Sequence, residues 1–178
     1  MMTRALVALG AAVAVAAVVG DVRADGAQRF EGKLFTFSYP SSAATAPGTD
    51  PSADVAVTVT LAGGQISASV IGATKRLSDG EVEDEATAWH GARIKNRAAW
   101  GMKAAGGPPR DSVKIGERRW LRWRDHIGSM LGAQEQTMTC GAVKEHLVCV
   151  IVSAPQKERE RGDALAAQIL SSLTVRKK

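Results

Sequence analysis

The chain has five cysteine and histidine residues, whose side chains commonly bind metals or perform catalysis: Cys140, Cys149, His90, His126 and His146. Thiolates and imidazoles are preferred zinc ligands, so the two cysteines and His146 are the candidate ligands of a metal site. Residues 147–152 have a strand pattern that His146 directly precedes, and residues three apart along a strand point to opposite faces, which separates His146 from Cys149. We therefore expect no metal site, and no motif in the sequence predicts a cofactor.

Nucleophilic catalysis needs a serine or cysteine beside a general base, commonly a histidine. The three histidines lie in three different predicted elements, and no serine or cysteine has a recognisable flanking motif. His90 follows Trp89 on a predicted helix, which favours a position on the surface or at its rim over a role as a base. The sequence therefore predicts a non-enzymatic protein, and an unrecognised hydrolase assembled only in the folded chain is left as an alternative.

The two cysteines are better explained as a disulfide. A two-residue turn at Lys144 and Glu145 would place Cys140 directly opposite Cys149 on neighbouring strands. Lys-Glu is an unfavourable pair for the type I′ turn that such a hairpin prefers, so other registers stay open. An exported chain with two cysteines most simply forms one disulfide, and we expect the bond Cys140–Cys149.

A run rich in arginine and tryptophan, residues 118–124, is the most unusual surface signal in the chain. Because side chains alternate on a strand, one face would carry Arg118, Trp120, Arg122 and Arg124, and the other Arg119, Leu121, Trp123 and Asp125. In one interpretation the arginine stems cover a tryptophan on a solvated strand. In the other the face is a basic, aromatic patch that binds an anionic or protein partner. This second interpretation predicts partner contacts by Trp120, Arg122 and Arg124, with the Trp120 ring partly open to water.

The strands that must position these residues are predicted from apolar periodicity. Residues 147–152 are apolar on both faces and rich in β-branched side chains, which is typical of a central strand that needs cover above and below. Residues 35–39 alternate aromatic and hydroxyl side chains, which is typical of a half-buried strand. Further strands are predicted over residues 55–61, 66–74, 112–115, 118–127 and 130–140, with a hairpin turn at Gly63 and Gly64 and loops over residues 41–52 and 101–110.

Two segments predict helices. The first, Asp79–Ala99, has a candidate cap at Ser78 and Asp79, and it has acidic residues in its first turns and basic residues in its last turns, which complements the helix dipole. The second, residues 156–173, places leucine and isoleucine on one face, and residues 176–178 are expected to be a frayed tail. Strands and helices in this order predict an α+β domain with an antiparallel sheet of about six strands covered by helices.

The N-terminus predicts export. Arg4 precedes an apolar run over residues 5–20, and Val22 and Ala24 suit positions −3 and −1 of a signal-peptide cleavage site. A membrane anchor is the alternative, but it needs ~20 strongly apolar residues, and this run is short and rich in alanine. We therefore expect residues 1–24 to be a signal peptide, residues 25–178 to form one domain, and the protein to be periplasmic or secreted without a stable membrane anchor.

The charge of the chain is mildly basic. The formal net charge is +5, and the predicted leader holds two arginines and one aspartate, so the remaining chain keeps +4. Such a charge favours contact with anionic partners, such as phospholipid headgroups, lipopolysaccharide or acidic proteins. It is too small to indicate nucleic-acid binding, which the export signal also disfavours.

Three motifs resemble the PsbP-like fold family, which includes exported bacterial proteins of the DcrB type. They are Phe35–Pro40 (F-T-F-S-Y-P) close behind the leader, residues 115–120 (I-G-E-R-R-W), and residues 148–155 (V-C-V-I-V-S-A-P) leading into a helix that ends I-L-S-S-L. The resemblance implies an αβα sandwich that binds partners rather than catalysing a reaction. The family shares no catalytic signature, so the resemblance assigns no site residue.

These observations lead to one main hypothesis and two alternatives. The main hypothesis is an exported, non-enzymatic protein that binds another protein or an anionic component of the cell envelope. The first alternative is a carrier of a small apolar ligand held between sheet and helix, and the second is the hydrolase. We expect no nucleic-acid partner, and the sequence does not predict the oligomeric state.

Overall fold

The computed structural model describes residues 26–48, 50, 53–99, 103–105, 111–129 and 132–176. The predicted signal peptide, and Met130 at the start of one predicted strand, lie outside these residues. Among the described residues, neither α-helix has the length and apolar character needed to cross a bilayer.

The larger of two sheets is antiparallel and has eight strands in the described part of the chain. These strands are β3 (Ala44–Pro47), β4 (Val55–Thr60), β5 (Ser67–Arg76), β6 (Lys103–Ala105), β7 (Asp111–Ile115), β8 (Arg118–Ser129), β9 (Gly132–Val143) and β10 (His146–Pro155). Their spatial order is β3-β4-β5-β10-β9-β8-β6, and β7 pairs with β8 on the same side as β6.

The strand β10 lies near the middle of this sheet and is buried on both faces, as predicted. Alternation sends Leu147, Cys149 and Ile151 into one hydrophobic core. The intervening valines, at 148, 150 and 152, enter a second core on the other face. A run that is apolar at successive positions is stable only if both faces are covered, so β10 determines that the fold has layers above and below the sheet.

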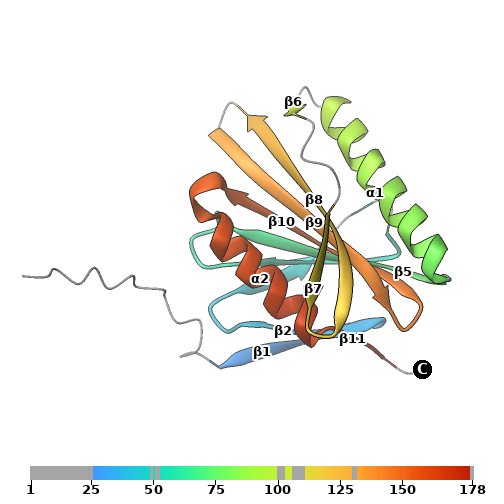
Figure 1. Cartoon of the computed structure of the whole chain (residues 1–178). Helices are drawn as coiled ribbons and strands as arrows, with labels where there is room; N and C mark the ends of the chain where they lie inside the picture. The colour runs from blue at the N-terminus through green and yellow to red at the C-terminus, as the bar shows by residue number, and fades with distance from the viewer. Residues whose placement is uncertain are drawn as a thin grey trace, which may run out of the picture.

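The helix α1 (Asp79–Ala99) covers the first core (Figure 1). Glu81 caps its N-terminus from within the first turn: its carboxylate accepts hydrogen bonds from the backbone nitrogen and the hydroxyl of Ser78 at 2.8 and 2.7 Å. Val82, Ala86 and Trp89 recur at helical spacing and pack against the β10 side chains. Both the bounds and the cap of this helix are as predicted.

The opposite face is covered by a second helix and a small sheet (Figure 1). The helix α2 (Arg159–Ser172) follows a short 3-10 turn (Gln156–Glu158), and the small sheet contains β1 (Ala27–Glu31), β2 (Phe35–Pro40) and β11 (Thr174–Val175). The helix lies close to β10 at Gly162, where a Cβ atom would be 2.9 Å from Cγ1 of Val152. Any larger side chain at this position would push the helix away from the strand.

The α+β class and the cover on both faces are confirmed, and the structure has more strands than the six or so expected. β3 and β6 lie in segments that were predicted to be loops, and β11 lies between the predicted second helix and the expected tail, where no strand was predicted. These strands are short, and β3 is exposed throughout, so none of them shows a clear apolar alternation. They form by pairing with strands of clearer pattern: β3 with the next strand β4, β6 with β8, and β11 with the distant β2.

The predicted disulfide is confirmed. The two-residue turn is at Lys144 and Glu145, both of which adopt positive φ angles, 50° and 66°. This turn sets Cys140 directly opposite Cys149, with 4.1 Å between their Cα atoms, and the sulfur atoms are bonded. Both cysteines are fully buried in the core beneath α1.

Replacing both cysteines should destabilise the fold without changing it. We expect the Cys140→Ala/Cys149→Ala variant to lose about 3 kcal/mol, because the closed loop of about ten residues no longer restricts the unfolded chain. Urea denaturation of the oxidised protein and the variant measures this difference. Equal free energies of unfolding would show that the bond does not stabilise the sandwich.

Candidate functional site

Trp120, expected to be a partly exposed partner contact, is buried. Only 1% of it is exposed, and it belongs to the core beneath α2. Its ring lies over Gly141 on β9, where a Cβ atom would be 2.7 Å from the ring. The strand alternation was assigned correctly, but α2 and the small sheet cover that face. The expectation for Trp120 is therefore wrong, and the residue is part of the core rather than of a binding surface.

Arg122 and Arg124 lie on the same face as Trp120 and are both paired with acids. Arg122 makes two hydrogen bonds to Asp111 on β7, at 3.0 and 2.5 Å. These bonds lower the pKa of Asp111 and raise the pKa of Arg122. Arg124 pairs with Asp163 on α2 at 3.1 Å. The role of the two arginines in partner binding stays a prediction, and a partner would have to displace these carboxylates.

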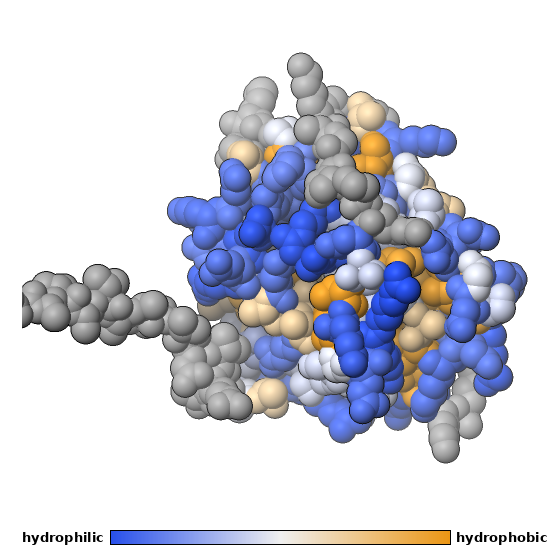
Figure 2. Space-filling view, viewed as in Figure 1, coloured by the Kyte–Doolittle hydropathy of each residue, from blue (hydrophilic) through white to orange (hydrophobic). Residues whose placement is uncertain are grey.

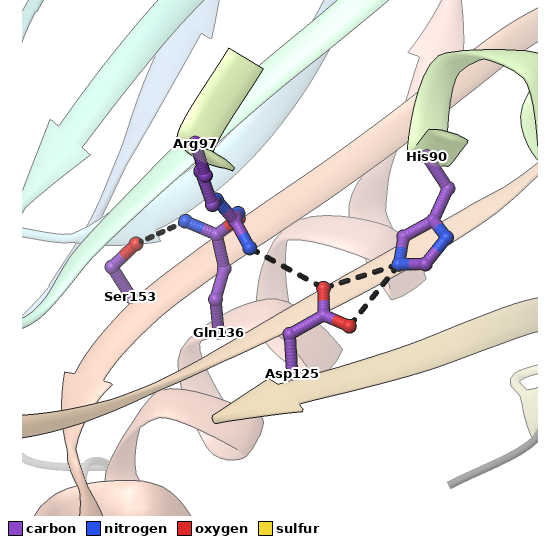
Figure 3. Close-up of polar contacts among 5 residues, drawn as sticks. All are labelled: His90, Arg97, Asp125, Gln136 and Ser153. Atoms are coloured by element: carbon purple, nitrogen blue, oxygen red, sulfur yellow. Dashed lines mark hydrogen bonds and ion pairs between the residues drawn. The ribbon is translucent and has the colours of Figure 1, made fainter. Parts of the chain in front are cut away.

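On the opposite face of β8, a polar cluster fastens the second half of α1 to the sheet (Figure 3). The Nε2 atom of His90 lies 3.2 and 3.1 Å from the two carboxylate oxygens of Asp125. Arg97, about two helical turns further along the same face of α1, donates to the same carboxylate at 3.4 Å. The pKa of Arg97 is lowered, first by burial and then by the neighbouring Arg93. Asp125 acts in the opposite direction but does not cancel this shift. Next to them, Gln136 donates to Ser153 at 2.8 Å.

His90 is at the edge of this interface, with 18% of its side chain exposed and its ring stacked on Trp123. A histidine oriented by a buried aspartate is part of many catalytic triads, where the other imidazole nitrogen contacts a nucleophile. Within the described residues, the hydrogen bonds of His90 go to Asp125 alone. The cluster therefore joins helix to sheet and shows no nucleophile.

At one end of the sandwich, the β7–β8 hairpin, the β9–β10 turn and the C-terminal segment lie near each other (Figure 1). Arg118 on β8 donates to the backbone oxygen of Leu173 at 3.0 Å, and Lys144 donates to that of Val175 at 3.2 Å. Arg176 donates to a backbone oxygen of the β1–β2 turn at 3.2 Å. These contacts tie the β7–β8 hairpin, the β9–β10 turn and the β1–β2 turn to the C-terminal segment, residues 173–176.

We call this surface the basic end, and define it by Lys33, Lys114, Arg118, Arg119, Lys144 and Arg176. All six residues are exposed. In the part of the chain that the structure describes, none of the six forms an ion pair with a carboxylate. Lys114 and Arg119 are directly opposite each other on β7 and β8, an arrangement of like charges that destabilises a sheet. The basic end is therefore a cluster of charge that the fold leaves uncompensated.

Two acids and two aliphatic side chains accompany these cations. Glu117 is exposed in the β7–β8 turn, and Glu145 pairs with Arg76 at 3.5 Å. Leu34 and Ile115 are half-buried beside the core. Sequence reasoning missed the basic end because its cations are scattered along the chain. The adjacent arginines 118 and 119 gave a local signal, but it was interpreted as part of a strand whose partner-binding face was Trp120, Arg122 and Arg124.

Removing the carboxylate of the α1 cluster should destabilise the protein strongly. We expect Asp125→Asn to cost about 3–5 kcal/mol, because Arg97, 10% exposed, is then buried without a counter-ion. The matched control is Asp111→Asn, which removes an ion pair whose aspartate is 52% exposed and should cost about 1 kcal/mol or less. Urea denaturation at neutral pH measures both, and equal costs would contradict the role given to Asp125.

No family model and no curated protein matches this sequence. Among solved structures, the cyanobacterial PsbP protein of Synechocystis sp. PCC 6803 is similar at 14% identity and a TM-score of 0.60, over 88% of this chain and 96% of that one. A Bacteroides thetaiotaomicron protein is similar at 11% identity and a TM-score of 0.53, over 81% of this chain and 46% of that one. LpqN of Mycobacterium tuberculosis, involved in cell envelope biogenesis, gives 12% identity and a TM-score of 0.49 over 88% of this chain and 95% of that one. The likeness to the cyanobacterial protein over nearly its whole length shows that this chain has the PsbP-like fold.

Proposed function

We propose that this protein is an exported, non-enzymatic binding protein, and that its basic end binds an anionic partner. The observation that carries the proposal is the difference between two sets of cationic side chains. Arg122 and Arg124 are matched with carboxylates inside the fold. The cations of the basic end are hydrogen-bonded to backbone oxygens or extend into solvent, so their charge is not neutralised.

An uncompensated cluster of this kind costs folding free energy. Like charges within about one Debye length, ~8 Å at physiological salt, repel each other. The facing pair Lys114 and Arg119 adds a repulsive cross-strand contact. An anion bound at this surface removes the repulsion, so the same charges that weaken the free protein strengthen the complex.

The buried disulfide supports the proposed compartment. Disulfides persist in oxidising compartments and are rare in the cytosol. The bond between Cys140 and Cys149 lies inside the core, where it supports the fold rather than a redox reaction. Together with the signal-peptide pattern of residues 1–24, this favours a periplasmic or secreted protein.

The test compares two variants that lose the same charge at different places. Lys114→Gln/Arg119→Gln removes the facing pair of the basic end, and Lys95→Gln/Lys157→Gln removes two exposed cations elsewhere. Two anionic ligands are titrated, poly-glutamate and vesicles containing phosphatidylglycerol. We expect the first variant to bind at least tenfold more weakly to whichever ligand the protein binds, because each cation near an anionic surface contributes about 1 kcal/mol.

The control variant should bind within about twofold of the unchanged protein. Both variants should unfold at nearly the same temperature as the unchanged protein, because surface substitutions rarely change stability by more than about 0.5 kcal/mol. Two results contradict the proposal. One is an equal loss of binding in both variants, and the other is a protein that binds neither ligand.

A further inference from the structure

We infer that the anionic partner of the basic end is the surface of a phospholipid bilayer, and that the protein docks on it with this end of the sandwich. The inference rests on the proposed function and specifies its partner. Three observations carry it: how the cations are distributed, how they are held, and which apolar side chains lie beside them.

The cations are distributed over an area rather than along a line. They come from four segments that meet at one end of the sandwich: the β1–β2 turn, the β7–β8 hairpin, the β9–β10 turn and the C-terminal segment (Figure 1). An extended acidic peptide is matched by a row of cations along one groove or strand edge. A planar anionic surface is matched by cations on several turns at one end of the molecule, because it can meet several of them at once.

Backbone contacts hold three of these cations in place before any partner arrives. Arg118, Lys144 and Arg176 each donate to a backbone oxygen, at 3.0, 3.2 and 3.2 Å. Each bond orders a long side chain without cancelling its charge. The loss of side-chain entropy on binding is correspondingly smaller, so the basic end is preorganised for an anionic surface. The nearby Glu117 opposes this attraction, whereas Glu145 is already paired with Arg76.

Apolar side chains reach the surface beside the cations. On β7, Val113 and Ile115 are half-buried, and Leu34 in the β1–β2 turn is half-buried as well. Figure 2 shows apolar surface interrupted by strongly hydrophilic side chains in the region of the β7–β8 hairpin. Cationic side chains with aliphatic neighbours suit the boundary between headgroups and acyl chains, where the charged tips reach phosphates and the apolar groups leave water.

The experiment measures sedimentation of the exported protein with vesicles. One set is phosphatidylcholine with a minority of phosphatidylglycerol, and the other is pure phosphatidylcholine. We expect binding to the anionic vesicles that is at least tenfold stronger than to the neutral ones and that falls as salt is raised. Lys114→Gln/Arg119→Gln should weaken this binding at least tenfold, whereas Lys95→Gln/Lys157→Gln should change it by less than about twofold.

A parallel titration with poly-glutamate distinguishes binding of anions in general from docking on a bilayer. If the protein binds poly-glutamate through Lys114 and Arg119 but does not bind anionic vesicles, the lipid inference is overturned and the proposed function stands. If it binds neither, both fail. Equal binding to anionic and neutral vesicles, or equal effects of the two variants on vesicle binding, would also overturn the lipid inference. Circular dichroism of each variant confirms that the fold is retained.

Discussion

The burial of β10 on both faces is the constraint on which the rest of the structure depends. Its apolar side chains alternate between two cores, so neither face of the sheet can be left to solvent. The helix α1 covers one face, and α2 with the small sheet covers the other. The disulfide from Cys149 to Cys140 then links β10 to β9 inside the α1 core. In the second half of α1, where apolar residues give way to His90, Arg93 and Arg97, polar contacts to Asp125 and Asp50 hold the helix to the rest of the fold.

The same constraint explains how the basic end arises. To cover the second face, α2 must cross β10 and return the chain to β2, where Thr174 and Val175 complete the small sheet. This return places the backbone oxygens of residues 173–176 beside the β7–β8 hairpin and the β9–β10 turn. Arg118 and Lys144 donate hydrogen bonds to these oxygens. Because the oxygens carry no formal charge, the positive charges of the two side chains are not neutralised. A surface of uncompensated cations is therefore a consequence of how the layers are closed, and its charge is available to a partner.

Local patterns predicted much of the fold and little of the site. The alternation of residues 147–152, the cap and charges of Asp79–Ala99 and the turn between the cysteines all depend on residues close in sequence, and the structure confirms them. The strand alternation of residues 118–124 was also assigned correctly, yet it did not show that α2 covers Trp120. Nor could it show that Asp111 and Asp163 pair with the arginines, since these acids come from other elements. The basic end depends wholly on contacts between distant segments, so only the folded chain shows it.

The central claim is that the basic end, and no other surface, meets an anionic bilayer. The most direct measurement is a two-dimensional NMR titration of the isotopically labelled, exported protein with small bicelles that contain phosphatidylglycerol. The account predicts that the amide signals of Lys33, residues 114–119, Lys144 and Arg176 shift or broaden first, while those of the exposed face of α1 stay unchanged, and that salt reverses the changes. Shifts centred on α1, or changes of equal size over the whole protein, would contradict it.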